Sequence, residues 1–275
     1  MAELPLDDGT IWYEERGEGR PLVFVHGGWS TSDAWERQVD RFADSYRVIT
    51  VDVRGHGKTG ATDARRYSVE LFADDLEGLL DHLDAEDPVL CGLSLGSMVV
   101  QEYLSRYPDA AAGAVLAGPV RSMPPVDMPA MVKPFVSPLP ALAMSLATMG
   151  SEATFRSMLG SIRATTGGAW LALEPSVRSA AIDAVGDVSA AEFRKIFGAL
   201  YQYDPPSLSG VATPTLVVYG DGEAPLVKRQ GQAIVGEVDD GGVVEIADAA
   251  HMVNQDAPEA FNAALAEFLD EPRAA

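Results

Sequence analysis

The stretch PVLCGLSLGSMVVQEYL, residues 88–104, decides the fold, because it places one serine between two glycines where one pattern changes into another. The residues before Ser94 form a continuous apolar run, which is typical of a strand buried on both faces. The residues after it have helical apolar spacing, with Val100 and Leu104 on one face. The stretch therefore predicts a buried strand, a sharp turn at Ser94 and a helix.

The two glycines explain how so sharp a turn is possible. Gly92 and Gly96 lack the Cβ atoms that would collide where a strand turns directly into a helix. The turn pushes the Ser94 hydroxyl outward and places it at a helix N-terminus, where the dipole and free N–H groups favour developing negative charge. The pattern of glycine, any residue, serine, any residue and glycine also occurs by chance, so its context carries the interpretation.

Apolar runs bounded by turn residues recur on both sides of this stretch. They lie at 21–28, 47–52, 113–118, 215–221 and 243–248. Helical patterns between them, as at 72–83 and 261–269, predict an α/β fold with a mostly parallel central sheet and helices on both faces. The last helix is expected to begin at Asp256-Ala257-Pro258-Glu259, with a cap, an early proline and an acid in its first turn.

One segment breaks this alternation. Residues 122–207 contain no convincing strand, carry several prolines early, and repeat Met and Leu at helical spacing over 142–159. This pattern predicts a helical insertion, which is either a packed excursion or a lid over a ligand site. We therefore expect a core domain made of 1–121 and 208–275, and a helical cap made of 122–207.

Composition restricts the class of protein. With 275 residues, of which 47% are hydrophobic, the chain can bury a large core. A single cysteine, Cys91, excludes an internal disulfide and a metal site of several thiolates, and is expected to be a buried small hydrophobe. The acidic N-terminus does not resemble a secretory signal, and the apolar runs are too short and broken to cross a membrane. These features indicate a globular cytoplasmic protein.

The charge is strongly negative. The 41 acidic against 20 basic side chains give a net charge of −21, which repels nucleic acid and anionic membranes, so we expect neither as a partner. The acids are scattered, as on the surfaces of proteins from salt-accumulating microbes, and not gathered in a tail. An ordinary acidic protein is the alternative interpretation.

This charge predicts a stability that depends on salt. At about 1 M salt the Debye length is roughly 3 Å, so repulsion between surface acids is screened. We therefore expect the melting temperature to be higher in molar KCl than in dilute buffer. An unchanged melting temperature would contradict the halophilic interpretation.

A serine hydroxyl needs a base to become nucleophilic, and the chain offers four histidines. His82 lies in a helical stretch among acids and is interpreted as a surface residue. His56 lies in a glycine-rich turn and is interpreted as structural, whereas at His26 the adjoining glycines suggest that the backbone matters more than the ring. His251 lies between the last apolar run and the last helix, which fits the chain order serine, acid, histidine.

The acid that orients such a base is expected after the apolar run at 215–221. Two carboxylates are available there, Asp221 and Glu223, both upstream of His251. Either one also fits a plain turn role, because the sequence GDG is a common turn signal.

Taken together, these motifs resemble the α/β-hydrolase superfamily, and the resemblance covers nearly all of the chain except 122–207. The residues that carry it are HGGW at 26–29, DVRGHGKT at 52–59, GLSLG at 92–96, PTLVVYGDGEAPLV at 214–227 and AAHMVNQDAPEAF at 249–261. The small esterase and enol-lactone hydrolase branch is the most similar part of the superfamily. The resemblance implies the α/β-hydrolase fold and acyl transfer through an acyl-enzyme.

The resemblance also implies roles for single residues. The nucleophile corresponds to Ser94 and the base to His251. The acid corresponds to Glu223, where the family more often has aspartate, so Asp221 is kept as the reserve. The oxyanion hole corresponds to the backbone N–H groups of Gly28 and Leu95.

The substrate implied is a small carboxylic ester or lactone, because serine at position 94 differs from the aspartate of dehalogenase and epoxide-hydrolase relatives. No metal or organic cofactor is implied, and the oligomeric state is left open. Arg121 and Arg163 are interpreted as solvated, with contact to a substrate carboxylate the less favoured reading. The apolar side chains expected to suit a pocket are Trp29, Met131, Phe135 and Leu139, followed by Leu142, Met144 and Met149.

Other functions share these features. A perhydrolase, a carbon–carbon bond hydrolase and an acyltransferase use the same triad, and the fold does not distinguish among them. A catalytically silent, hydrolase-like receptor would keep the pocket and bind without turnover.

Overall fold

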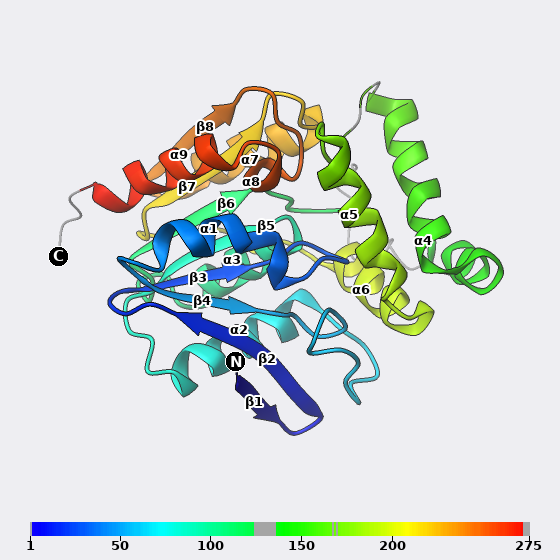
Figure 1. The fold of residues 1–275 in the computed structure, drawn as a ribbon, viewed down its shortest axis with the longest axis horizontal. Coiled ribbons are helices and arrows are strands. Elements are labelled where there is room, and N and C mark those ends of the chain that lie inside the picture. The colour runs from blue at the N-terminus through cyan, green and yellow to red at the C-terminus, as the bar shows by residue number, and fades with distance from the viewer. Residues whose placement is uncertain (1, 124–135, 167, 169, 272–275) are drawn as a thin grey trace.

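The computed structural model describes residues 2–123, 136–166, 168 and 170–271, and a sheet of eight strands lies at the centre of this part (Figure 1). The strand order is β1-β2-β4-β3-β5-β6-β7-β8; β1 and β2 are antiparallel, and β3 to β8 run parallel. The mostly parallel α/β sheet is thereby confirmed. The strands are β1 (Ala2–Leu6), β2 (Gly9–Arg16), β3 (Pro21–Val25), β4 (Arg47–Val51), β5 (Val89–Leu93), β6 (Gly113–Ala117), β7 (Thr215–Gly220) and β8 (Gly241–Ile246).

The antiparallel pair β1 and β2 was not expected from the sequence. It forms a hairpin across Asp7 and Asp8 at one edge of the sheet, and both strands have exposed ends, which carry Glu3 in β1 and Glu15 in β2. Such half-exposed strands lack the continuous apolar run of the buried parallel strands. The other edge, β8, is also partly exposed, contrary to the expectation of burial on both faces.

Helices cover both faces of this sheet. They are η1 (Ser32–Trp35), α1 (Glu36–Phe42), α2 (Val69–His82), α3 (Leu95–Arg106), α4 (Leu139–Thr166), α5 (Pro175–Gly186), α6 (Ala190–Gln202), α7 (Pro225–Glu237), α8 (Val253–Asp256) and α9 (Pro258–Asp270). Alternate residues of β3 show the two faces: Leu22 and Phe24 pack in the cluster with α1 and α9, while Val23 and Val25 pack in the cluster with α2, α3 and α7.

Three helices, α4, α5 and α6, stand apart from the two layers, beyond the carboxyl ends of the parallel strands (Figure 1). They come from the segment in which the sequence predicts only helices. Helix α6 is joined to the loop before α2 by the Tyr67 hydroxyl, which donates to Glu192 Oε2 over 2.5 Å. These helices therefore lie where loops from the strand ends converge.

The described residues have three further features. Within 2–123, 136–166, 168 and 170–271, no helix is both long and apolar enough to cross a membrane, and no cluster of His, Cys, Asp and Glu could hold a metal ion. Cys91 is fully buried in β5, where burial raises the pKa of its thiol.

Candidate active site

Ser94 lies in the turn between β5 and α3. Its backbone has φ 52° and ψ −108°, in the left-handed half of the map that residues other than glycine rarely adopt. The Ser94 N–H donates to the carbonyl oxygen of Ala117 in the neighbouring strand β6 over 3.0 Å. A strained backbone of this kind persists only where the surroundings impose it, and such positions are concentrated at active sites.

The two flanking glycines are required by close packing. A Cβ atom on Gly92 would lie 2.3 Å from the carbonyl oxygen of Gly96, and one on Gly96 would lie 2.1 Å from the carbonyl oxygen of Val25. Neither position accepts a side chain without movement of the backbone. The glycines therefore let α3 begin directly against β3 and β5, with its free N–H groups beside Ser94.

His251 and Glu223 form a buried hydrogen-bonded pair. His251 Nδ1 donates to Glu223 Oε2 over 2.7 Å, and the two side chains are 5% and 0% exposed. Glu223 lies in the turn after β7, and His251 lies in the loop after β8. Because the carboxylate accepts at Nδ1, the proton is held there and Nε2 is left as the basic nitrogen.

The reserve acid Asp221 does not share this position. Its side chain is exposed, and its backbone carbonyl oxygen accepts a hydrogen bond from Lys228 Nζ over 2.9 Å. Of the two carboxylates considered from the sequence, the structure therefore brings Glu223, and not Asp221, to His251.

Trp170, in the segment between α4 and α5, contacts both members of the pair. Its indole Nε1–H donates to Glu223 Oε1 over 2.5 Å, and its ring centroid lies 4.3 Å from that of His251. Glu223 Oε1 also accepts the Ala224 N–H over 2.7 Å. The carboxylate thus receives three donors in total, which fix its orientation.

Two segments are joined by backbone hydrogen bonds: the histidine loop, residues 247–252, and the Trp170 segment, residues 170–174. The His251 N–H donates to the Trp170 carbonyl oxygen over 3.0 Å. The Asp256 carboxylate accepts the N–H groups of Leu173 and Ala250, each over 2.9 Å. Asp256 therefore does not cap α9 as expected; that helix has Ala257 at its N-cap position and no side-chain cap.

Gly118, directly after β6, provides the space for the imidazole. It has φ 49°, and a Cβ atom there would lie 3.0 Å from His251 Nδ1. A side chain at this position would press on the ring. Gly118 therefore contributes to the placement of His251.

Ser94 and His251 line the same cavity, which has a volume of about 450 Å³. Its walls are largely apolar and include Trp29 from the loop after β3 and Phe155, Met158 and Leu159 from α4, with further side chains from the Trp170 segment, α5, α6 and α7. This volume lies within the range of small-molecule sites, about 300 to 1,000 Å³.

Gly28 and Leu95, the two residues expected to supply backbone N–H groups to an oxyanion hole, lie close to each other. Leu95 is the first residue of α3, so its N–H has no partner within the helix. A Cβ atom on Gly28 would lie 3.8 Å from the Leu95 Cβ, which places the two residues side by side. Gly28 also lines the cavity that Ser94 lines.

Two buried histidines hold the loop that carries Gly28. His56 Nε2 accepts the Trp29 N–H over 2.8 Å, and Trp29 itself has φ 59°. His26 Nε2 accepts the Val53 N–H over 3.0 Å. Because each Nε2 accepts a hydrogen bond, both rings are neutral and protonated at Nδ1. The structural role expected for His56 agrees with these contacts, whereas at His26 the ring itself makes a contact that the sequence interpretation did not expect.

Because of these two buried histidines, we expect the free energy of unfolding to fall in acid. Burial lowers the pKa of His26, and burial together with nearby His26 lowers the pKa of His56 to about 3. Below the ordinary value of 6.5 the unfolded chain therefore binds more protons at these rings than the folded chain does. His56 should therefore lower the free energy of unfolding by about 1.4 kcal/mol per pH unit as the pH falls, and His26 should act in the same direction.

The measurement is denaturant unfolding at a series of pH values from about 7 down to about 5, a range in which ordinary carboxylates stay ionised. His82→Gln is the matched control, because His82 is exposed at the end of α2. We expect the same slope in the parent and in this variant. A free energy of unfolding that stays level over the range would refute the prediction.

Comparison with known proteins identifies the family. The sequence profile of the alpha/beta hydrolase family matches residues 22–264. The chain belongs to the alpha/beta hydrolase family. The resemblance and the fold inferred from the sequence are thereby confirmed.

Relatives within the alpha/beta hydrolase family include enzymes of several activities. The chain is 34% identical to the bifunctional esterase/perhydrolase DCH of Acinetobacter calcoaceticus, over 46% of each protein. It is 25% identical to 3-oxoadipate enol-lactonase 2 of Acinetobacter baylyi, over 95% of this chain and 94% of that protein. The chain spans about half or less of the length of the first curated relatives that it matches.

A solved structure supports the same assignment. An esterase from Thermogutta terrifontis superimposes with a TM-score of 0.75 and 26% identity, covering 94% of this chain and 93% of that one. The likeness extends well beyond the segment around Ser94.

Of the pocket residues expected from the sequence, some line the cavity of this alpha/beta hydrolase and others lie elsewhere. Trp29 lines the cavity, whereas Leu139 packs against the core. Met131 and Phe135 lie outside the described residues. Leu142 is buried in the core, and Met144 and Met149 are 67% and 51% exposed.

Arg121 forms an ion pair with Glu237 over 2.8 Å, which occupies its guanidinium.

Sequence reasoning missed the residues that take their place. Phe155, Met158 and Leu159 follow helical spacing in the same insertion, but that spacing does not say which face of α4 meets the cavity. Trp170 lies between two helices, in a stretch without periodicity. An isolated tryptophan in a Gly-rich connection was the one available signal.

Proposed function

We propose that this protein is a serine hydrolase that cleaves a carboxylic ester or a lactone. Ser94 is the nucleophile, His251 the general base and Glu223 the acid that orients it. The observation that carries the proposal is the cavity shared by Ser94 and His251, with His251 Nδ1 held 2.7 Å from the buried Glu223 carboxylate. This arrangement leaves Nε2 as the atom that can take the serine proton.

In the first step, Ser94 Oγ attacks the substrate carbonyl carbon while His251 Nε2 accepts the hydroxyl proton. The carbonyl oxygen becomes an oxyanion, which the N–H groups of Gly28 and Leu95 stabilise. The C–O bond to the alcohol then breaks, and His251 returns the proton to the leaving oxygen. The acyl group stays on Ser94.

In the second step, water attacks the acyl-enzyme and His251 Nε2 accepts its proton. The oxyanion forms again at the same place and collapses, which releases the acid and restores the Ser94 hydroxyl. Glu223 stabilises the imidazolium in both steps, and the Trp170 ring, tilted by 30° with its centroid 4.3 Å away, adds an aromatic neighbour to it. For a lactone the alcohol remains attached to the acyl group, so one product is released.

The cavity favours a largely apolar acyl group. Met158 and Leu159 are among its wall residues, and Trp29 packs on Phe193 with ring centroids 4.7 Å apart. We further propose that 122–207 acts as a cap on a core domain of 1–121 and 208–275. The position of Trp170 against Glu223 supports a role for this segment in the chemistry as well as in substrate enclosure.

Perhydrolysis is a second candidate, favoured by the 34% identity to a bifunctional esterase/perhydrolase. In this reaction hydrogen peroxide attacks the acyl-enzyme in place of water, and a peroxy acid and free Ser94 result. The same oxyanion donors serve both reactions, so both activities are compatible with one site.

The test combines labelling and turnover. A fluorophosphonate should label Ser94 covalently, and p-nitrophenyl esters of increasing acyl length, with a few lactones, should be hydrolysed in high salt. Addition of hydrogen peroxide to the ester assay would reveal peroxy acid if perhydrolysis occurs. A protein that neither reacts with the fluorophosphonate nor turns over any of these substrates would be a silent binding protein, and the proposal would fail.

A further inference from the structure

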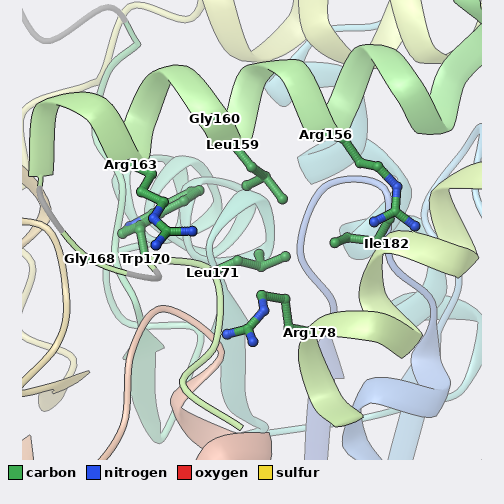
Figure 2. A pocket seen from close by; sticks show the side chains of 9 residues that line it. All are labelled: Arg156, Leu159, Gly160, Arg163, Gly168, Trp170, Leu171, Arg178 and Ile182. Carbon is green, nitrogen blue, oxygen red and sulfur yellow. The ribbon is translucent and has the colours of Figure 1, made fainter. Parts of the chain in front are cut away.

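A second cavity, of about 410 Å³, lies between α4 and α5 and is rich in arginine. Figure 2 shows Arg156, Leu159 and Arg163 on the underside of α4, with Arg178 of α5 facing them. The α4 residues are spaced three and four apart, so they share one helix face. Gly160 lies on the same face, and no atom lies within 4 Å of where its Cβ would be, which keeps the cavity open.

Two of the three guanidinium groups lack a carboxylate partner in the described part of the chain. Arg156 pairs with Glu152 over 2.8 Å. Arg178 Nη1 donates to the backbone carbonyl oxygen of Ala172 over 2.8 Å, which does not neutralise it. For Arg163 the described residues provide neither an acid nor any other hydrogen-bond partner. A local positive charge on a chain of net charge −21 therefore remains open to a ligand.

This arginine cavity adjoins the cavity that contains Ser94. Leu159, Trp170 and Leu171 line both, so the two cavities share a wall. Trp170 in this wall also contacts His251 and donates to Glu223. A group bound at the arginines would lie against the residue that orients the acid.

We propose that the arginine cavity binds the anionic end of a small molecule, a carboxylate or a phosphate, through Arg163 and Arg178. Guanidinium groups match such oxyanions in geometry as well as charge. The anion is either the far end of the substrate, in which case the inference rests on the function proposed above, or a separate small molecule bound beside the active site.

The first experiment measures binding without turnover. Inorganic phosphate and pimelate are titrated into the full chain by calorimetry, at constant ionic strength set with KCl. The parent should bind at least one of them saturably, and Arg163→Gln should weaken that binding by about tenfold, as expected for loss of one charge-assisted hydrogen bond. Arg194→Gln removes the same charge from an exposed position on α6 and should bind as the parent does.

The second experiment asks whether the anion belongs to the substrate. It compares kcat/KM for mono-p-nitrophenyl pimelate and p-nitrophenyl heptanoate, which differ by a terminal carboxylate in place of a methyl group. A preference of the parent for the pimelate ester that falls by about tenfold in Arg163→Gln assigns the anion to the substrate. Arg178→Lys, which keeps the charge, should retain more of the preference than Arg178→Gln.

The outcomes separate this inference from the proposed function. If anion binding is saturable and needs Arg163, but kcat/KM is the same for the two esters, the cavity binds a separate anion. Anion binding without turnover of either ester keeps the anion site and removes the hydrolase proposal. Ester turnover with no anion binding and no preference for the pimelate ester overturns the anion site and leaves the hydrolase proposal standing.

Discussion

Ser94→Ala is expected to lower kcat/KM for p-nitrophenyl esters by a factor on the order of 10⁴ to 10⁶, because alanine at the position of the proposed nucleophile cannot form the acyl-enzyme. The fold should be retained. The hydrogen bonds that hold the turn run through the backbone N–H and carbonyl oxygen of Ser94, and alanine keeps both. The measurement is steady-state hydrolysis, with the melting temperature as the check on folding.

Ser105→Ala is the matched control, because Ser105 lies near the far end of the same helix, where its hydroxyl donates to the Glu102 carbonyl oxygen over 2.8 Å. It should hydrolyse esters at the parent rate, and a fluorophosphonate should label it as completely as it labels the parent. A Ser94→Ala protein that folds and still hydrolyses esters at the parent rate would eliminate Ser94 as the nucleophile.

Glu223→Gln is expected to reduce kcat by about 10³ to 10⁴, a loss comparable to that of an orienting acid in a triad. Glu223 accepts from three donors, namely His251 Nδ1, Trp170 Nε1 and the Ala224 N–H. A glutamine brings an NH₂ group that cannot accept. If that group faces the ring, it favours a proton on Nε2, which is the wrong tautomer for a base toward Ser94.

Asp221→Asn is the comparison that identifies the acid, because it makes the same chemical change two residues away on an exposed side chain. Its kcat should stay within about twofold of the parent, as expected for a surface substitution. Assayed side by side, the variant with the larger loss marks the acid. A larger loss in Asp221→Asn would transfer the role to Asp221 and leave the buried pair structural.

The sequence was most informative where the local backbone geometry leaves no room for a side chain. Gly92 and Gly96 tolerate no side chain, and this requirement can be read directly from GLSLG. The apolar runs of the parallel strands are equally plain, because strands buried on both faces have no polar side to interrupt them. Fold class and the turn at Ser94 both follow from such local signals.

The sequence was least informative where the outcome depends on contacts between distant segments. Apolar spacing in the insertion indicated helices, but which residues face the cavity depends on how α4 is rotated about its axis, so Leu139 was expected there in place of Phe155. Asp256 has the position of a helix cap and instead binds N–H groups of the Trp170 segment and the histidine loop. Neither result is encoded in neighbouring residues.

The link from Trp170 to Glu223 bears on how this protein would discriminate by size. A bulky acyl group that fits only by displacing Trp170 would break the 2.5 Å hydrogen bond to the carboxylate, and could bind well while reacting slowly. Selectivity against oversized substrates would then be expressed in kcat more than in KM. If KM changes along a series of acyl lengths while kcat stays constant, Trp170 does not set the size selectivity in this way.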